Sequence, residues 1–294
     1  MKRLLAAGLL GLIASVGSAD DSGHPLTLWR ADGANNSIYL LGSIHLLREQ
    51  DHPLHNAIDA AFADADIIVM ELDMDDLDPA YTQAAFNRAG VMTDGTTLKD
   101  LMGDGPYAQA EEAASVIDIP LDMLAQSEPW LAAITVELMA LYRIGFNPML
   151  GVEMTITNRA TAAGKPIEGL ETVDEQLDFL DSLPLDAQRE MLLQTLIESA
   201  GLSESIDGMI DAWHHGDIET LERDLLSTIE QQPELHAALL VNRNRRWVET
   251  IAGWVDDDRN YLVVVGALHL VGEHGVPALL ANRGIGIHQL SASE

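Results

Sequence analysis

Two histidines far apart in the chain end the same short pattern of a glycine, two other residues and a histidine. The pattern reads GSIH at residues 42–45 and GALH at residues 266–269, so His45 and His269 occupy matching places. Imidazole is a neutral nitrogen ligand for metal ions and a proton carrier near neutral pH. Two such groups brought together would suit a metal site or an acid/base site.

A carboxylate at a third strand end would complete a metal site. Glu71 lies near the end of an apolar run, IIVMEL at residues 67–72. Two histidines and a carboxylate are a common ligand set for a divalent ion, and the chain has no cysteine to offer a thiolate instead. Water on such an ion can have its pKa lowered to about 7 and attack as hydroxide. We therefore predict that His45, Glu71 and His269 hold Mn, Co or Zn.

These three groups need strands that end at one edge of a sheet. Apolar, β-like runs precede both motifs, at residues 37–41 and 261–265. A glycine after a buried strand lets the backbone turn without a Cβ clash, so each histidine is expected at the carboxyl edge, where α/β folds place their sites. The two ends of the chain should therefore share one sheet. Further strand signals lie at residues 26–30 and 285–290, and helical signals at residues 53–65 and 277–282.

The middle of the chain is predicted to be helical. From about residue 79 to residue 254 the apolar residues follow helical periodicity, with one apolar helix expected at residues 130–142. Residues 165–172 interrupt this block and are typical of a short strand, with Thr172 placed to cap the next helix. We predict an α/β (α+β) fold in which a mixed sheet from both chain ends carries the paired motifs. A large helical insertion, about residues 79–254, then interrupts a single domain of residues 20–294.

The segment of residues 1–19 is typical of a secretory signal. Two basic residues precede an apolar stretch at residues 4–16, and small residues follow at residues 17–19. A membrane-spanning helix needs about 20 apolar residues, so this stretch is too short to span well. We therefore expect cleavage near Ala19, a periplasmic or secreted product, and no stable membrane insertion after cleavage.

The composition excludes one class of partner. The chain has 47 Asp and Glu against 16 Lys and Arg, a formal net charge of −31 at pH 7. Such a field repels phosphate backbones and anionic lipid, so nucleic acid is not an expected partner. A net charge of this kind serves solubility first, and it also attracts cations.

Several longer pieces resemble one protein family. They read YLLGSIHLL followed by IVMELD, then GKPIEGLETVDEQ, NRNRRW and VVVGALHLVGEHGV. Their order and spacing are similar to those of the TraB/GumN group, which includes the Tiki metalloproteases and the pheromone-shutdown protein PrgY. The resemblance implies an α/β core with paired Gly-x-x-His motifs and an acidic site, and metal-dependent peptide hydrolysis of the kind shown for Tiki-type members.

The resemblance also implies a set of functional residues. Glu153 stands where relatives often have aspartate. The other positions match the family's motifs one by one. They are the motif histidines His45 and His269, the acid Glu71, the glutamate Glu171 of the Leu-Glu-Thr piece, and the pair Arg243 and Asn244.

Glu171 and Arg243 are predicted to act in catalysis. Glu171 lies at an expected strand-to-helix turn, which suits a general base, a ligand or a group that orients an imidazole, and equally suits a carboxylate at a helix N-terminus. Arg243 lies in a basic cluster of an acidic chain and could bind a substrate carboxylate or stabilise an oxyanion. Arg245 and Arg246 are expected on a solvated face. Proton transfer is assigned to either Glu171 or Glu71.

Other conspicuous residues are predicted to be structural. His269 and His274 are five residues apart, whereas the H-x-x-E-H zinc motif needs histidines four apart on a helix. His274 is therefore expected in a turn or outside the ligand set. The segment WHHGD at residues 213–217 is interpreted as a helix stop and restart, because adjacent histidines on a helix point apart. Trp247 is expected in the core.

The expected function is that of an exported metal-dependent hydrolase, most simply a peptidase that acts on peptides or unfolded protein segments. The alternative is a non-catalytic periplasmic binding protein that sequesters a peptide signal, a metal or haem in the same pocket. A ligand set looks the same whether or not turnover occurs, so the sequence leaves both hypotheses open. Either function makes a peptide or protein a candidate partner.

Overall fold

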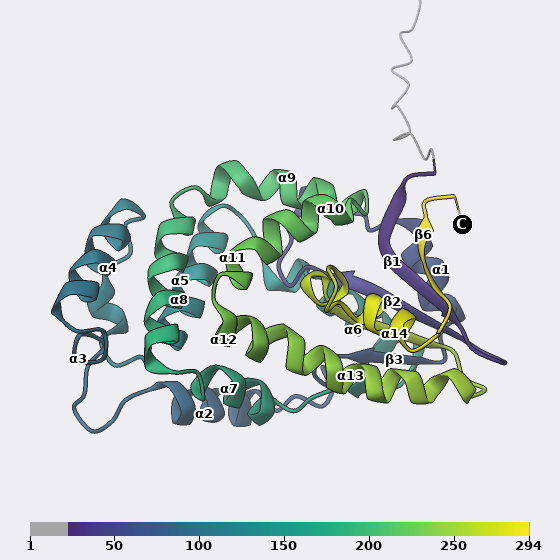
Figure 1. Cartoon of the computed structure of the whole chain (residues 1–294), viewed down its shortest axis with the longest axis horizontal. Coiled ribbons are helices and arrows are strands. Elements are labelled where there is room, and N and C mark those ends of the chain that lie inside the picture. The colour runs from purple at the N-terminus through teal and green to yellow at the C-terminus, as the bar shows by residue number, and fades with distance from the viewer. Residues whose placement is uncertain (1–22, 294) are drawn as a thin grey trace, which may run out of the picture.

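The described part of the chain contains a six-stranded mixed sheet, which lies in the right half of Figure 1. The structure is a computed structural model that describes residues 23–293, so the predicted signal at residues 1–19 lies outside the described residues. The strand order across the sheet is β4-β3-β5-β2-β1-β6. The strands are β1 Pro25–Asp32, β2 Ser37–Ser43, β3 Ile67–Met70, β4 Ile167–Gly169, β5 Tyr261–Gly266 and β6 Ile287–Ser291.

Strands from both ends of the chain lie side by side, as the sequence predicts. β5 lies between β2 and β3 and is parallel to both, whereas β1 is antiparallel to β2 and to β6. β4, which comes from the middle of the chain, adds a parallel edge strand beside β3. The predicted α/β class and the mixed sheet built from both chain ends are therefore confirmed.

The central strands are apolar along their whole length because both faces of the sheet are covered. Every residue of β2, β3 and β5 is buried. One face packs against α1, α6 and α9, and the other packs against α13 and α14. These helices are α1 Asn56–Asp64, α6 Val152–Ala163, α9 Leu202–His214, α13 Asn242–Gly253 and α14 Val276–Asn282.

Most of the remaining helices form a block beside the sheet, at the left of Figure 1. The block has an apolar core of its own between α3, α4, α5 and α8, while α2 and α7 pack against α5. Its helices are α2 Pro79–Gly90, α3 Leu98–Met102, α4 Asp104–Val116, α5 Pro129–Arg143, α7 Val173–Asp181 and α8 Leu185–Ser199. The connection from α9 to α13 runs through α10 Ile218–Leu221, η4 Glu222–Leu226, α11 Ser227–Glu230, α12 Pro233–His236 and η5 Ala237–Val241.

Local sequence signals define several element ends. Thr172 caps α7 through reciprocal hydrogen bonds with Glu175, as predicted. Gly164 ends α6 in the left-handed conformation, with φ of 66°. Helix α1 begins at Asn56, slightly later than predicted, because the side chain of His55 caps it.

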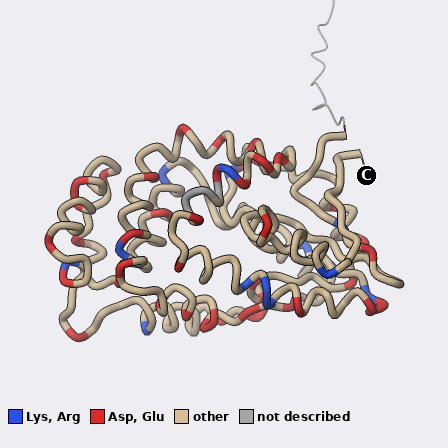
Figure 2. Tube along the Cα trace, in the orientation of Figure 1, with Lys and Arg blue, Asp and Glu red and all other residues tan. Residues whose placement is uncertain are grey.

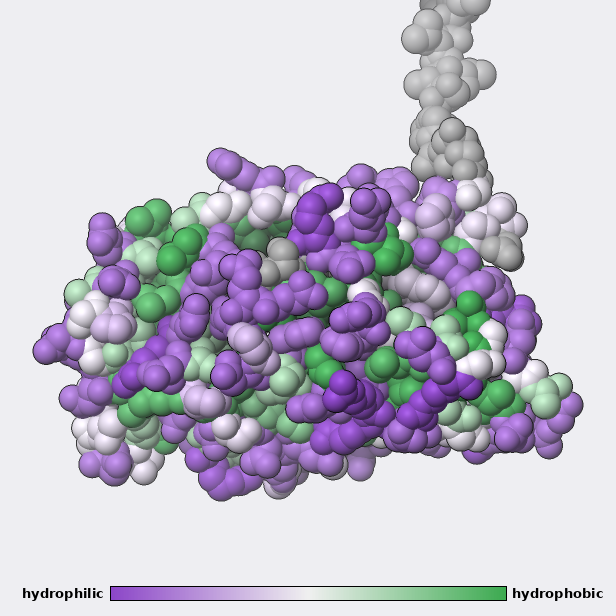
Figure 3. Space-filling view, viewed as in Figure 1, coloured by the Kyte–Doolittle hydropathy of each residue, from purple (hydrophilic) through white to green (hydrophobic). Residues whose placement is uncertain are grey.

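The surface is strongly acidic. Figure 2 shows Asp and Glu on most elements of the described chain, whereas Lys and Arg are sparse. Hydrophilic residues cover most of the face seen in Figure 3, with smaller apolar patches between them. Within residues 23–293, no helix is both long enough and apolar enough to cross a bilayer. The field at this surface favours cationic over anionic ligands.

Candidate functional site

Three strand ends bring the predicted ligands to one edge of the sheet. Ser43 of β2 pairs with Gly266 of β5, and Met70 of β3 pairs with Val264 of β5. These strands are parallel and end nearly in register, so the residues that follow them meet at the same edge. The three residues are His45, Glu71 and His269.

The three side chains converge around Gly266. Its amide donates a hydrogen bond of 2.8 Å to Glu71 Oε1. A Cβ atom placed on Gly266 would lie 3.4 Å from Glu71 Oε1, 3.6 Å from His269 Cδ2 and 3.8 Å from His45 Nε2. His269 Nε2 lies 3.9 Å from Glu71 Oε1. Gly266 therefore leaves a small space that all three predicted ligands border.

The glycine of the first motif serves close packing. A Cβ atom on Gly42 would lie 2.5 Å from Thr27 Cγ2 and 3.1 Å from Ala267 Cα. Neither motif glycine has a positive φ, so the turning role that the sequence suggested is not the reason for glycine. For Gly42 the reason is that the two motifs lie against each other, with Gly42 next to Ala267.

His45 is exposed and paired with an acid. Its side chain is 62% exposed, and its Nδ1 lies 2.6 Å from Glu153 Oε1. Glu153 also accepts a short hydrogen bond from the hydroxyl of Ser43. Helix α6 brings Glu153 here because Gly151, just before the helix, lies against the backbone of His45. The Glu153 carboxylate raises the pKa of His45 to about 10, so this imidazole is charged at neutral pH.

His269 is buried and neutral. Its Nδ1 lies 2.6 Å from Asn244 Oδ1, and Arg243 Nη1 donates to its Nε2 at 3.2 Å. Because arginine cannot accept, Nε2 is the acceptor and Nδ1 carries the hydrogen. The amide nitrogen of Asn244 donates to the carbonyls of His269 and His274, which turns its oxygen towards the ring. Burial lowers the pKa of His269 to about 3, in agreement with the neutral tautomer.

A buried arginine joins the two predicted acids. Arg243 Nη2 donates to Glu71 Oε2 and to Glu171 Oε2, each at 2.7 Å. The side chains of Arg243 and Glu171 are 9% and 3% exposed. Burial alone would raise the pKa of Glu71, but the guanidinium of Arg243, the charged ring of His45 and the hydrogen bond from Gly266 hold it below its ordinary value. Glu71 is therefore ionised at neutral pH beside a guanidinium.

Glu171 is bonded to donors on every side. Its oxygens accept hydrogen bonds from Arg243, from Arg246 at 3.0 Å and from the indole of Trp247 at 3.0 Å. The amide of Gln176 donates to both Glu171 and Glu71. A carboxylate held in this way has few lone pairs left to take a proton. The geometry favours Glu171 as the group that holds Arg243 in place.

Helix α13 contributes more to the site than the sequence predicts. Arg245 is exposed as expected, but Arg246 donates to Glu171 although its own side chain is 50% exposed. Trp247 is in the core as predicted, and in addition its ring centroid lies 4.4 Å from that of His269. The signal for this was the i, i+3, i+4 spacing, which places these groups on one face of the helix.

The residue types fit a divalent metal ion. Both histidines are bonded through Nδ1 to an oxygen of another side chain, which is how outer contacts orient the ligands of metal sites. Glu71 adds an ionised oxygen. Within residues 23–293, no three such groups stand close enough together to hold an ion as they are, and Arg243 is bonded to both Glu71 and His269. Metal binding here would therefore require a rearrangement around Arg243.

Two cavities meet at His45. A cavity of about 380 Å³ extends from His45 and His269 into the space between α5, α9 and η5, and most of its lining is apolar. A second cavity, of about 320 Å³, borders His45, Glu71, Glu153 and four methionines. Cavities of this size admit organic ligands. An extended ligand could thus occupy both cavities and cross the predicted metal ligands between them.

His274 lies outside the group around Gly266. Its ring is 37% exposed, with Nε2 3.5 Å from Glu273. Only its backbone carbonyl reaches the site, by accepting a hydrogen bond from Asn244. His274 thus contributes to the position of Asn244 through its backbone.

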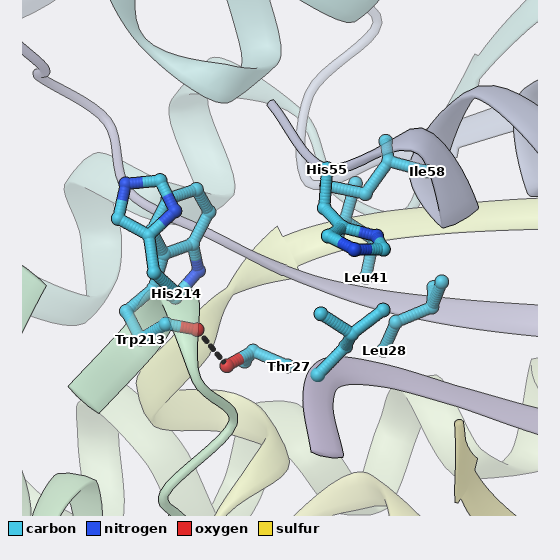
Figure 4. Close-up of a pocket in the computed structure, with 8 residues that line it drawn as sticks. Thr27, Leu28, Leu41, His55, Ile58, Trp213 and His214 are labelled. Carbon is cyan, nitrogen blue, oxygen red and sulfur yellow. Dashed lines mark hydrogen bonds between the residues drawn. The ribbon is translucent and has the colours of Figure 1, made fainter. Parts of the chain in front are cut away.

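The segment WHHGD is structural. Figure 4 shows Trp213 at a small cavity, where its carbonyl accepts a hydrogen bond of 2.7 Å from Thr27. Its indole donates a second bond of 2.7 Å to the carbonyl of Gly42. Asp217 caps α10. This segment anchors α9 under the first motif and restarts the helix, which confirms the structural interpretation.

Comparisons with known proteins agree with the motifs. The sequence profile of the TraB/PrgY/gumN family matches residues 27–289. The Uncharacterized protein YbaP of Escherichia coli (strain K12) is 22% identical over 246 residues, which cover 84% of this chain and 88% of that protein. A Metalloprotease TIKI homolog of Amphimedon queenslandica is 27% identical over 168 residues, which cover 49% of this chain and 33% of that protein. No solved structure matches the chain.

Proposed function

The chain belongs to the TraB/PrgY/gumN family, and from this premise we propose that it is a metal-dependent hydrolase that cleaves peptide bonds. The observation that carries the proposal is the convergence of His45, Glu71 and His269 around Gly266 at the carboxyl edge of the sheet. The similarity to a metalloprotease TIKI homolog supports the same class of reaction.

His45, Glu71 and His269 are the residues that would hold Mn, Co or Zn. A bound ion of this kind supplies a water of lowered pKa, about 7, and polarises a carbonyl. Glu153 and Asn244 hold the two imidazole rings through their Nδ1 atoms. Nε2 of His269 would be a ligand atom as it stands, and Nε2 of His45 would become one on releasing the proton that it carries at neutral pH.

In this proposal Arg243 stabilises negative charge on the substrate. Its guanidinium lies beside Glu71 and His269, in a buried position where a charge acts strongly on a developing oxyanion. Glu171 is a positioning residue, because it holds Arg243 through three of the guanidinium contacts. Glu71 Oε1 borders the space beside Gly266, and we propose that it takes a proton there.

The alternative function is binding without catalysis, to a peptide, a metal or haem. One observation favours it. Arg243 donates to Glu71 and to His269, so these two groups bind a guanidinium rather than face an open ligand position. A peptide-binding protein would keep this arrangement, whereas a metal-dependent enzyme has to open it.

Metal analysis combined with a peptide library tests the proposal. Purified protein is loaded with Mn, Co or Zn, its metal content is measured, and cleavage products are identified by mass spectrometry. We expect one bound ion and cleavage in the wild type, and loss of both in His45→Ala and His269→Ala. His288→Ala, an exposed histidine on β6, is the matched control. Tight peptide or haem binding with no cleavage under any metal would instead support the binding protein.

We also propose that the protein is exported, through the signal predicted at residues 1–19. N-terminal sequencing of the protein from the periplasmic or secreted fraction should find a start near residue 20. An intact Met1 on membrane-bound protein would contradict this proposal.

A further inference from the structure

The larger cavity beside the site has a mostly apolar wall. It measures about 380 Å³ and opens next to His45 and His269. Its wall comes mainly from α5, α9, η5 and the loop after β2. The apolar residues of this wall include Leu141, Phe146, Leu202, Ile206, Met209 and Leu239.

Glu137 places one carboxylate in this apolar lining. It is the only acidic residue of helix α5, whose sequence is PWLAAITVELMALYR. It forms no hydrogen bond or ion pair with any described residue. The other charged groups of the lining already form ion pairs, His45 with Glu153 and Arg243 with two buried acids. Glu137 is thus the acid of the cavity that has no partner in the described chain.

The surroundings of Glu137 favour the binding of a cationic group. Burial raises the pKa of Glu137, and the positive charge of His45 opposes this effect only in part. When a ligand fills the cavity and displaces its water, a carboxylate among apolar side chains is unfavourable unless a positive charge meets it. The Glu137 side chain is exposed to the cavity, so a ligand can supply that charge. The net charge of −31 draws cationic ligands towards the protein as a whole.

The smaller cavity has a different character. Its charged groups are already paired, Glu71 with Arg243 and Glu153 with His45. The rest of its lining is rich in flexible apolar side chains, which adapt to apolar groups of varied shape. They are Met70, Met74, Met149 and Met154, together with Leu72 and Pro148.

Resting on the proposed peptidase function, we propose that the larger cavity binds a lysine or arginine side chain of the substrate peptide, and that Glu137 selects it. The apolar wall packs against the aliphatic stem of that side chain, and the carboxylate of Glu137 binds its charged end. The cavity opens at His45 and His269, so the selected residue lies next to the bond that is cleaved. Glu137 is a specificity residue, and it is separate from the group around Gly266.

Peptide pairs that differ only in lysine against norleucine test this assignment, because norleucine keeps the stem and removes the charge. For one position next to the cleaved bond, the wild type should favour lysine in kcat/KM by at least about 30-fold. Glu137→Gln should remove most of this preference and change kcat/KM for the norleucine peptide little. Glu112→Gln, an exposed glutamate on α4, is the matched control and should behave like the wild type.

A charge-reversal variant distinguishes a loss of specificity from a loss of folding, because a poorly folded protein would not gain a new preference. Glu137→Lys should shift the preference towards a peptide with glutamate at the same position. Equal losses for the lysine and norleucine peptides in Glu137→Gln, or no cationic preference in the wild type, would overturn the assignment.

Peptide binding separates this inference from the proposed reaction. If no peptide is cleaved with any metal, the hydrolase proposal fails, and the same peptide pairs are then compared by fluorescence anisotropy. A preference for lysine that disappears in Glu137→Gln supports the pocket. Equal binding of both peptides, or no binding, overturns it.

Discussion

Two copies of one motif end in opposite electrostatic states. After β2, His45 is 62% exposed and charged, because Glu153 raises its pKa to about 10. After β5, the side chain of His269 is 7% exposed and neutral, because burial lowers its pKa to about 3. The two strands are equally buried and run in parallel register, so the strands do not explain the difference.

The difference comes from the helices that pack on the two strand ends. Helix α6 brings one acid to His45 and leaves the rest of the ring in solvent. Helix α13 surrounds His269 with the amide of Asn244, the guanidinium of Arg243 and the ring of Trp247. The β5 side is therefore held by a buried network and the β2 side by a single ion pair, and the two sides should respond differently to mutation.

The largest effect is expected from Arg243→Ala, on the buried side. This change leaves Glu71 and Glu171 without their shared cation, and breaking a buried charge pair costs about 3–5 kcal/mol. Urea unfolding measures the loss. Arg245→Ala, an exposed neighbour on the same helix, is the control and should change stability by less than about 0.5 kcal/mol. A similar, small change in both variants would show that the network around His269 does not stabilise the fold.

The second largest effect is expected from Asn244→Ala, which should weaken metal binding. This change removes the hydrogen bond between Asn244 Oδ1 and His269 Nδ1, so neither the orientation of the ring nor its tautomer is fixed any longer. Loss of such a contact to a metal ligand typically lowers the metal affinity by about 10–100-fold. Competition with a chelator measures the affinity. Asn242→Ala, on an exposed position of the same helix, should bind metal as the wild type does. An unchanged metal affinity in Asn244→Ala would mean either that His269 is not a metal ligand or that Asn244 does not orient it.

The pH dependence of stability should have opposite signs on the two sides. His269 has a pKa of 6.5 when unfolded and about 3 when folded, so the unfolded chain binds more protons between these values and stability falls as the pH falls. For His45 the folded pKa is about 10, so the folded chain binds more protons above 6.5 and stability falls as the pH rises. The buried His269 contributes a slope of at most about 1.4 kcal/mol per pH unit. The slope from His45 should be much shallower, because its ring lies largely in solvent.

Urea unfolding across this pH range checks the two slopes. His269→Gln should flatten the acid side and leave the alkaline side as it is, while His288→Gln should change neither. An acid slope that persists in His269→Gln would assign that slope to other groups, among them Glu71, whose lowered pKa acts in the same direction.

The smallest effect on stability is expected from Glu153→Gln, because the ring of His45 lies largely in solvent. Its effect on titration should still be clear. Without the carboxylate, the pKa of His45 should fall from about 10 towards its ordinary value of 6.5. NMR titration of the imidazole resonances follows both histidines in one experiment. A shift in His269 as large as that in His45 would mean that the two sides are coupled through the space beside Gly266.

Strand ends and helix ends were open to prediction because their signals are local. The apolar runs before His45 and His269 alternate with helical segments, and this order already predicts parallel strands that end at one edge. Thr172 precedes a glutamate at capping distance, which predicts the start of α7. The helical block was visible for the same reason, since periodicity needs no knowledge of partners.

The surroundings of each side chain were not open to prediction in the same way. Glu171 is suitable for a general base by its place in the sequence, yet in the fold it is bonded to Arg243, Arg246 and Trp247. Its role in proton transfer stays a prediction. Glu137 went unnoticed, although a lone acid in the apolar helix α5 was a signal that could have pointed to it.

The sequence by itself determined the paired motifs, the central sheet and the three ligand candidates His45, Glu71 and His269, because strand periodicity and chain order are written in neighbouring residues. Only the tertiary structure decided which imidazole is charged and which is neutral. The pKa of a side chain depends on burial and on charges brought by residues such as Glu153 and Arg243, which lie 108 and 26 positions away from their histidines. Those contacts exist only once α6 and α13 have packed against the edge of the sheet.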